Sequence, residues 1–295
     1  MNLYKVCMSI VILFVYGCST TSVSTPTNVS STAQTPVKIL DKISFFAWDG
    51  IENYQELNNR IDGYENPVIY LNPVDNGEYK FEENAQELHS VNLKVWYLMS
   101  GDGNDSRYPT LDYVQDQVDK IVEYNQNHTQ QVLGMSFDVE PWVDFEEQNS
   151  SDNQDDWQEY LDFMSEARDI LHDKGLKISI AIPFWIDRQT EAFPNDRPIN
   201  YDVIDIADEV IVMTYTVFAE RIEPYAKTSL EYANSHHKDI KIALEMSQND
   251  QEENVSFYTH PEDIKDVLDM HLEYETFRGY MIHTLKSFLE SGIDI

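Results

Sequence analysis

Apolar and polar residues alternate along this chain with two periods, one typical of strands and one typical of helices. Eight short runs are rich in aliphatic, β-branched and aromatic residues, and they span 42–48, 67–72, 93–100, 132–140, 176–185, 209–215, 240–247 and 278–285. Between several of these runs the apolar residues recur every three or four positions, which predicts amphipathic helices at 110–125, 155–175 and 260–274. Thr110 is a predicted N-cap, Pro261 suits a first helical turn, and Gly175 predicts a helix end.

Strands that alternate with helices predict parallel βαβ units. Eight of them in about 255 residues predict one α/β domain, a single (β/α)8 TIM barrel. No glycine-rich phosphate-binding turn follows the first strand, which argues against a dinucleotide-binding sheet. Such barrels build their active sites at the carboxyl ends of the strands. We therefore expect the site among the residues that end these runs, which are Trp48, Asp49, Asn72, Ser100, Asp138, Glu140, Trp185, Tyr215, Glu245 and His283.

Residues 1–18 have the pattern of a secretory signal peptide. Lys5 precedes an apolar run at 6–17, which is shorter than the roughly 20 residues that span a bilayer. The ending VYGC resembles the lipobox of bacterial lipoproteins, which implies lipidation of Cys18 and, from Ser19, sorting to the outer membrane. Residues 19–36 are mostly Ser and Thr and predict a flexible tether. The barrel, 37–295, would then be held at the bacterial cell envelope by a lipid anchor.

Charge and cysteine content exclude several classes of function. The formal net charge of −33 excludes nucleic acid as a partner and argues against binding to an anionic lipid surface. Both cysteines, Cys7 and Cys18, lie in the signal region, so the barrel has no disulfide, cysteine nucleophile or thiolate metal site. We predict no metal and no cofactor. The acidic loop 100–106 lacks a closing Glu, since Tyr113 stands there, and His236–His237 has no ligand-spaced acid.

The fourth run contains two carboxylates within an otherwise apolar stretch. Strand alternation places Asp138 and Glu140 on one face with Ser136, while Phe137 and Val139 face the helices. Two carboxylates on one buried face cannot both ionise cheaply, so at least one is expected to keep its proton near neutral pH. A protonated carboxyl at a barrel mouth is what general acid catalysis requires.

This stretch, LGMSFDVEPW at 133–142, is similar to the fourth-strand signature D-G-x-D-x-D-x-E of glycoside hydrolase family 18, the chitinase-like barrels. It matches at Gly134, Asp138 and Glu140, while Leu133 and Ser136 replace the first two aspartates. The resemblance implies that Glu140 protonates the glycosidic oxygen. It also implies that Asp138 orients a 2-acetamido group of the substrate, which attacks the anomeric carbon in place of an enzyme nucleophile.

Two later stretches extend the resemblance over most of residues 42–288. VMTYT at 212–216 is similar to the sixth-strand M-x-Y-D and matches at Met213 and Tyr215, with Thr216 in place of the acid. GYMIHTL at 279–285 is similar to the eighth-strand G-x-M-x-W, with His283 in place of the tryptophan. The resemblance implies that Tyr215 hydrogen-bonds the acetamido group. The substitution at His283 implies a sugar site that differs from a chitinase's.

The remaining predicted binding residues are aromatic or lie in these motifs. Trp48, Trp142 and Trp185 fall near strand ends, where flat rings can stack on sugar faces. We expect substrate contacts from these tryptophans and from Asp49, Met213 and His283. Together these features predict a glycoside hydrolase that cleaves an extracellular or envelope polysaccharide containing N-acetylated amino sugars, with Glu140 as the general acid.

Three alternatives remain open. VEPW at 139–142 also resembles the N-E-P motif of the large retaining-glycosidase clan, in which Glu140 would be the acid/base and Glu245 the nucleophile, about 5 Å apart. A second alternative is a non-catalytic barrel that binds glycans, although lectin-like relatives of chitinases typically lose the acid at the position of Glu140. A third is another class of hydrolase, disfavoured because no Ser–His–acid set or metal cluster is visible.

Overall fold

The computed structural model describes residues 43–293, except 52, 62, 63, 65, 66, 76, 101–106, 145–153, 189–196 and 249–253. The predicted signal peptide at 1–18, with Cys18, and the tether at 19–36 lie outside the described residues. Within the described ranges, no helix combines the length and the apolar character needed to cross a membrane.

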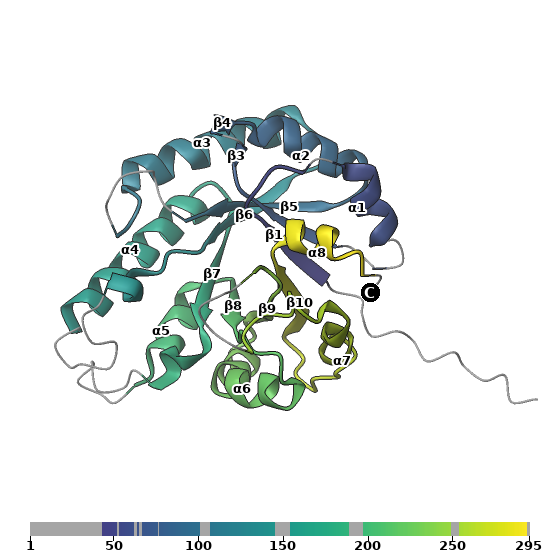
Figure 1. Ribbon diagram of the computed structural model, residues 1–295. Helices are drawn as coiled ribbons and strands as arrows, with labels where there is room; N and C mark the ends of the chain where they lie inside the picture. Colours follow the sequence, from purple (N-terminus) through teal and green to yellow (C-terminus); the bar gives the residue numbers. More distant parts are fainter. Residues whose placement is uncertain are drawn as a thin grey trace, which may run out of the picture. The chain divides into compact units, whose positions relative to one another are not determined.

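Eight parallel strands close into a barrel in the order β1-β10-β9-β8-β7-β6-β5-β2 (Figure 1). Each predicted run overlaps one strand, so the (β/α)8 prediction is confirmed. The strands are β1 Ile43–Ala47, β2 Val68–Leu71, β5 Lys94–Met99, β6 Val132–Phe137, β7 Lys177–Pro183, β8 Glu209–Met213, β9 Asp239–Glu245 and β10 Phe277–His283. A small antiparallel hairpin, β3 Val74–Asp75 with β4 Glu78–Tyr79, follows β2.

Helices lie outside the strands (Figure 1). They are α1 Tyr54–Arg60, α2 Phe81–Ser90, α3 Leu111–Asn127, α4 Gln154–His172, α5 Ile199–Ile206, α6 Ala219–Ser235, α7 Ile264–Leu268 and α8 Leu285–Ser291. Short 3-10 turns are η1 Pro141–Asp144, η3 Phe184–Arg188 and η4 Pro261–Asp263.

The predicted helix signals are correct at two helices and overextended at a third. Thr110 caps α3 by accepting a hydrogen bond from the Tyr113 N–H at 3.2 Å, and α4 ends at His172, shortly before Gly175 at φ +73°. The predicted helix at 260–274 is only η4 followed by α7. Leu272 is buried beyond the end of α7, and a periodic pattern cannot distinguish such a residue from one on a helical face.

The alternation predicted for the fourth run places its side chains correctly. Phe137 of β6 packs edge-on against Phe163 of α4, with ring centroids 6.0 Å apart. The side of β6 that carries Phe137 therefore faces the helices. Gly134 is required by close backbone approach, because a Cβ there would lie 2.0 Å from the Lys177 carbonyl oxygen of β7. The register between β5 and β6 shifts at this point. The chain then continues from β6 to the carboxyl end of the barrel, where Asp138 follows.

Candidate active site

Asp138 and Glu140 follow β6 at the carboxyl end of the barrel. The Asp138 backbone N–H donates to the Met99 carbonyl oxygen of β5 at 2.8 Å, which fixes where its side chain begins. The Asp138 side chain is partly buried, and its Oδ1 has no hydrogen-bond partner among the described residues. Glu140, two residues further on, is open to solvent. The residues after β6 therefore place the partly buried carboxyl of Asp138 and the exposed carboxyl of Glu140 at the carboxyl end of the barrel.

Both carboxyls hold their protons more tightly than usual. Burial raises the pKa of Asp138 to about 6, against the lowering effect of the positive charge on His283. Burial raises the pKa of Glu140 to about 7, and the negative charge of Asp138 raises it as well, against the lowering effect of His283. Of the two, Glu140 therefore keeps its proton to the higher pH.

Glu245 ends β9 and is tied down at both oxygens. Its Oε2 lies 2.7 Å from His283 Nδ1, and its Oε1 accepts the Ser247 backbone N–H at 2.5 Å and the Ser247 hydroxyl at 2.6 Å. Glu245 is only 7% exposed. His283, which ends β10, is its neighbour in the strand register. Burial alone would lower the pKa of His283, but the hydrogen bond and charge of Glu245, with Asp138 and Glu140, raise it above 6.5.

Three aromatic rings surround the His283 imidazole. Phe46 and Trp48, from β1 and the residues after it, meet it edge-on at centroid distances of 5.9 and 6.4 Å, and Tyr215 lies 5.9 Å away. Burial and the charges of Asp138, Glu245 and Glu140 raise the pKa of Tyr215 well above 10, so its hydroxyl stays a donor. The structure thus brings the four predicted catalytic residues and His283 into one cluster.

The other predicted substrate contacts divide into accessible and buried residues. Trp48 and Trp185 are partly exposed. Trp142 is 3% exposed and packs against Trp157 at 6.0 Å and Trp185 at 6.1 Å, so the predicted sugar platform at Trp142 is wrong. Its local sequence suits either role, and the packing of α4 decides for the core. Met213 is also buried, at 5% exposure.

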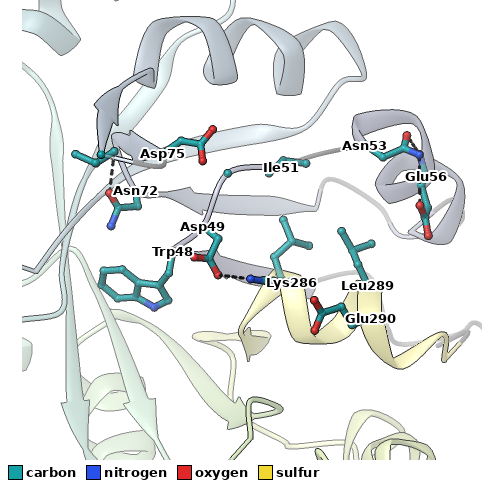
Figure 2. Close-up of a pocket in the computed structure, with 14 residues that line it drawn as sticks. Trp48, Asp49, Ile51, Asn53, Glu56, Asn72, Asp75, Lys286, Leu289 and Glu290 are labelled. Carbon is teal, nitrogen blue, oxygen red and sulfur yellow. Dashed lines mark hydrogen bonds and ion pairs between the residues drawn. The ribbon is translucent and has the colours of Figure 1, made fainter.

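A cavity of about 540 Å³ adjoins Trp48 (Figure 2). Its walls come from the chain after β1, from Asn72 after β2, from Asp75 of the β3–β4 hairpin and from α8. Asp49 lines it and forms an exposed ion pair with Lys286 of α8, at 3.6 Å. Asp49 and Asn72 were predicted from strand ends. Asp75 and Lys286 were missed, because they belong to elements beyond the strand ends and carry no local signal.

The side chains of the described residues do not include three His, Cys, Asp or Glu placed to hold a metal ion together. Ser247 and Phe46 contact Glu245 and His283, respectively, and sequence reasoning gave neither of them a role. Phe46 lies inside the predicted first strand and carried no further signal. The signal for Ser247 was present but weak: it lies two positions after Glu245, on the same predicted strand face.

Comparison with known proteins supports the fold. No protein-family model matches the chain, and no curated protein is similar to it in sequence. A glycoside hydrolase family 18 chitinase from Pseudoalteromonas aurantia is similar in structure, with TM-score 0.50, 13% identity, and coverage of 85% of this chain and 98% of that one. A family 18 chitinase from Chromobacterium violaceum gives TM-score 0.50 and 13% identity, with 86% and 80% coverage.

A β-glucuronidase is similar in structure to a comparable degree. A mutant of β-glucuronidase 2 from Bacteroides uniformis has TM-score 0.55 at 9% identity, covering 83% of this chain and 30% of that one. At such identities the likeness concerns the fold. The chain therefore has the (β/α)8 barrel fold found in chitinases of family 18 and in other glycosidases, and its chemistry has to be argued from the site.

Proposed function

We propose that this protein is a glycoside hydrolase with Glu140 as its general acid. The observation that carries the proposal is the Asp138–Glu140 pair at the barrel mouth, with pKa values raised to about 6 and about 7. An accessible carboxyl that keeps its proton near neutral pH can protonate a leaving oxygen, and a sheltered partner can stabilise the charge that develops. The fold likeness to chitinases and the motif resemblance agree with this assignment.

In the mechanism we favour, Glu140 donates its proton to the glycosidic oxygen as the bond from that oxygen to the anomeric carbon breaks. The carbonyl oxygen of the substrate's own 2-acetamido group bonds to the same carbon and gives an oxazolinium ion. Asp138 accepts the amide N–H and Tyr215 donates to the acetamido group. Water, deprotonated by Glu140, then opens the oxazolinium ion. The substrate would be an envelope or extracellular polysaccharide with N-acetylated amino sugars, and the cavity beside Trp48 has room for further units.

The main rival makes Glu245 a nucleophile, as in retaining glycosidases. Its environment speaks against that role. A nucleophile needs a free oxygen directed at the anomeric carbon, whereas both Glu245 oxygens accept hydrogen bonds, from His283 and Ser247, and the residue is 7% exposed. A non-catalytic glycan-binding barrel is the second rival, and the retained Glu140 disfavours it.

Two reagents distinguish the mechanisms in the full-length protein. A thiazoline mimic of the oxazolinium ion should inhibit strongly, because it resembles the state that the site stabilises. A 2-fluoro glycoside should leave no sugar on the enzyme. Intact-mass spectrometry reports the outcome, and an adduct on Glu245 would establish the retaining mechanism instead. A panel of bacterial polysaccharides, assayed for new reducing ends, tests cleavage itself, and binding without cleavage would favour the lectin-like alternative.

We also propose that the protein is a lipoprotein of the bacterial outer membrane, anchored through Cys18. The proposal rests on the apolar run at 6–17 that ends at Gly17-Cys18 and on the Ser/Thr-rich stretch that follows. Cys18→Ala should move the protein from the membrane fraction to the soluble fraction and abolish the mass increase of lipidation. Cys7→Ala, in the same signal region, is the matched control and should change neither. A Cys18→Ala protein that stays in the membrane fraction would contradict the anchor.

A further inference from the structure

Within the described part of the chain, the residues of β6 that precede Asp138 donate no hydrogen bond to its Oδ1 atom. Ser136 lies two residues before Asp138 on the same face, and its buried hydroxyl has no hydrogen-bond partner among the described residues. Leu133, further back, is apolar. Asp138 Oδ1 is likewise buried without a partner. The charge that controls Asp138 must therefore come from other strands of the barrel.

A chain of hydrogen bonds joins Ser247, Glu245 and His283 at the ends of β9 and β10. The backbone N–H and hydroxyl of Ser247 hold Glu245 Oε1, and Glu245 Oε2 holds His283 Nδ1. The backbone around the chain is also tied, since the Met246 N–H donates to the His283 carbonyl oxygen at 2.5 Å and the Phe257 N–H donates to the Glu245 carbonyl oxygen at 2.9 Å. The imidazole is thus fixed in position at one nitrogen.

The second nitrogen of His283 is free within the described part of the chain. Nε2 makes no hydrogen bond there, and the side chain is 21% exposed. The ring is oriented by the edges of Phe46 and Trp48 and by Tyr215. The titratable groups that face it are Glu245 from β9, Asp138 and Glu140 after β6, and Tyr215 after β8. Phe46 of β1 and Trp48 after it contribute uncharged rings.

We propose that Ser247 and Glu245 hold His283 as a cationic positioning residue, whose charge sets how Asp138 and Glu140 share their proton. The proposal deepens the glycosidase function and rests on it for its catalytic meaning. Within the described part of the chain, His283 is the one cation of this cluster and acts on three carboxyls. Its charge favours the ionised forms of Asp138 and Glu140 and so lowers both pKa values from what burial alone would give. A neutral residue at 283 would lack this effect.

Two substitutions test the charge of His283 and the charge of Glu245 separately. His283→Gln removes the cation, so the pKa values of both Asp138 and Glu140 should rise. Glu245→Gln keeps a side chain of the same shape, but it removes the anion that keeps His283 protonated. Glu140 should then respond as it does in His283→Gln. Asp138 should respond less, because its pKa loses the raising effect of Glu245 together with the lowering effect of His283.

The first readout is NMR titration of the full-length protein, with labelled imidazole nitrogens and labelled carboxyl carbons. It requires no substrate. His283, assigned by its loss in His283→Gln, should titrate above 6.5 in the wild type and at lower pH in Glu245→Gln. The Asp138 and Glu140 carboxyls should titrate at higher pH in His283→Gln. His172→Gln is the matched control, since His172 pairs with Asp208 at 2.9 Å and is more exposed. That variant should move neither carboxyl.

The proposal would be overturned, even if the enzyme cleaves glycans, if His283 titrated at the same pH in Glu245→Gln as in the wild type. It would also be overturned if the titration midpoints of the Asp138 and Glu140 carboxyls did not change in His283→Gln. If cleavage is found, both limbs of the pH profile of kcat/KM should move to higher pH in His283→Gln, which a purely structural role would not cause. Limbs that stay in place would also overturn the positioning role. If the titration midpoints move as expected but no glycan is cleaved, the result would support the role of the His283 charge and count against the proposed glycosidase function.

Discussion

Two groups of charged side chains lie inside this barrel, one around Lys241 and one around His283. The Lys241 group joins β2, β7, β8 and β9, and the His283 group collects residues that end or follow β6, β8, β9 and β10. The Lys241 group is buried, whereas the His283 group combines the buried Glu245 with the exposed Glu140. They differ in how completely their charges are matched, and this difference separates a stabilising cluster from a reactive one.

In the Lys241 group every charge has a partner. Lys241 Nζ lies 3.2 Å from Glu209 Oε2 and donates to the Tyr70 hydroxyl at 2.6 Å. The Tyr70 hydroxyl in turn donates to Glu209 Oε1, which also accepts from the Ser179 hydroxyl at 3.1 Å. Because β2 and β9 are not adjacent in the barrel, these contacts cross its interior. One cation and one anion balance, so the cluster has no proton to give.

The His283 group has three carboxyls and one cation. Glu245 is paired with His283, but Asp138 Oδ1 has no partner among the described residues and Glu140 faces the solvent. Burial raises the pKa values of Glu140 and Tyr215 most, and the unbalanced negative charge of the neighbouring carboxylates raises them further. A site that must bind and release a proton needs such an imbalance. The comparison teaches that burial combined with incomplete pairing marks the candidate catalytic residues, since the Lys241 group is buried but fully paired.

The largest effect is expected from Glu140→Gln. A general acid contributes about 100-fold to 10,000-fold in rate, so glycan cleavage should fall by that factor. At pH 4, where the Glu140 carboxyl is protonated, the melting temperature should stay close to the wild type, because Glu140 is exposed and makes no hydrogen bond or ion pair with the described residues. Glu166→Gln, an exposed residue of α4, is the matched control and should keep full activity. An active Glu140→Gln enzyme would rule out every glycosidase mechanism considered above.

Lys241→Met should show the opposite behaviour. It leaves Glu209 buried without its cation, which costs about 3–5 kcal/mol of unfolding free energy, measurable by urea titration. The folded fraction should keep its activity, since Lys241 does not contact the mouth. The double variant Lys241→Met/Glu209→Leu removes both charges and should recover most of the loss. A cost below about 1 kcal/mol for the single variant would show that the Lys241 group contributes little to stability.

Asp138→Asn should give the smallest effect, and one that depends on pH. The pKa of Asp138 is raised from 3.8 to about 6, so the folded state binds this proton more tightly than the unfolded state. The contribution is complete below pH 3.8 and is lost as the pH rises through about 6. At 1.36 kcal/mol per unit, Asp138→Asn should be more stable than wild type by up to about 3 kcal/mol at pH 8, and close to it at pH 4.

Urea unfolding at these two pH values tests the Asp138 prediction. Asp173→Asn is the matched control, because Asp173 is exposed after α4, and it should change stability by less than about 0.5 kcal/mol at either pH. Equal stability of Asp138→Asn and wild type at pH 8 would mean that the Asp138 carboxylate is hydrated, and the contrast between the two groups would weaken.

Much of this arrangement could be predicted from local sequence. The eight apolar runs predict the eight strands because strand burial repeats every second residue, and the helix caps are local hydrogen bonds, as at Thr110. Strand polarity then predicts that Asp138, Glu140, Tyr215, Glu245 and His283 meet at one end of the barrel. These are statements about single segments and their direction, for which neighbouring residues carry enough information.

Only the tertiary structure decided which of these side chains pair. Ser247 orients Glu245, Glu245 holds His283, and Lys241 reaches Tyr70 across the interior, yet no local pattern favours these partners over others. Trp142 had the same local signals as Trp48, but the packing of α4 buried it. Contacts between non-adjacent strands depend on how the sheet closes and how each strand is offset from the next, and that offset is fixed by the packing of the whole barrel at once.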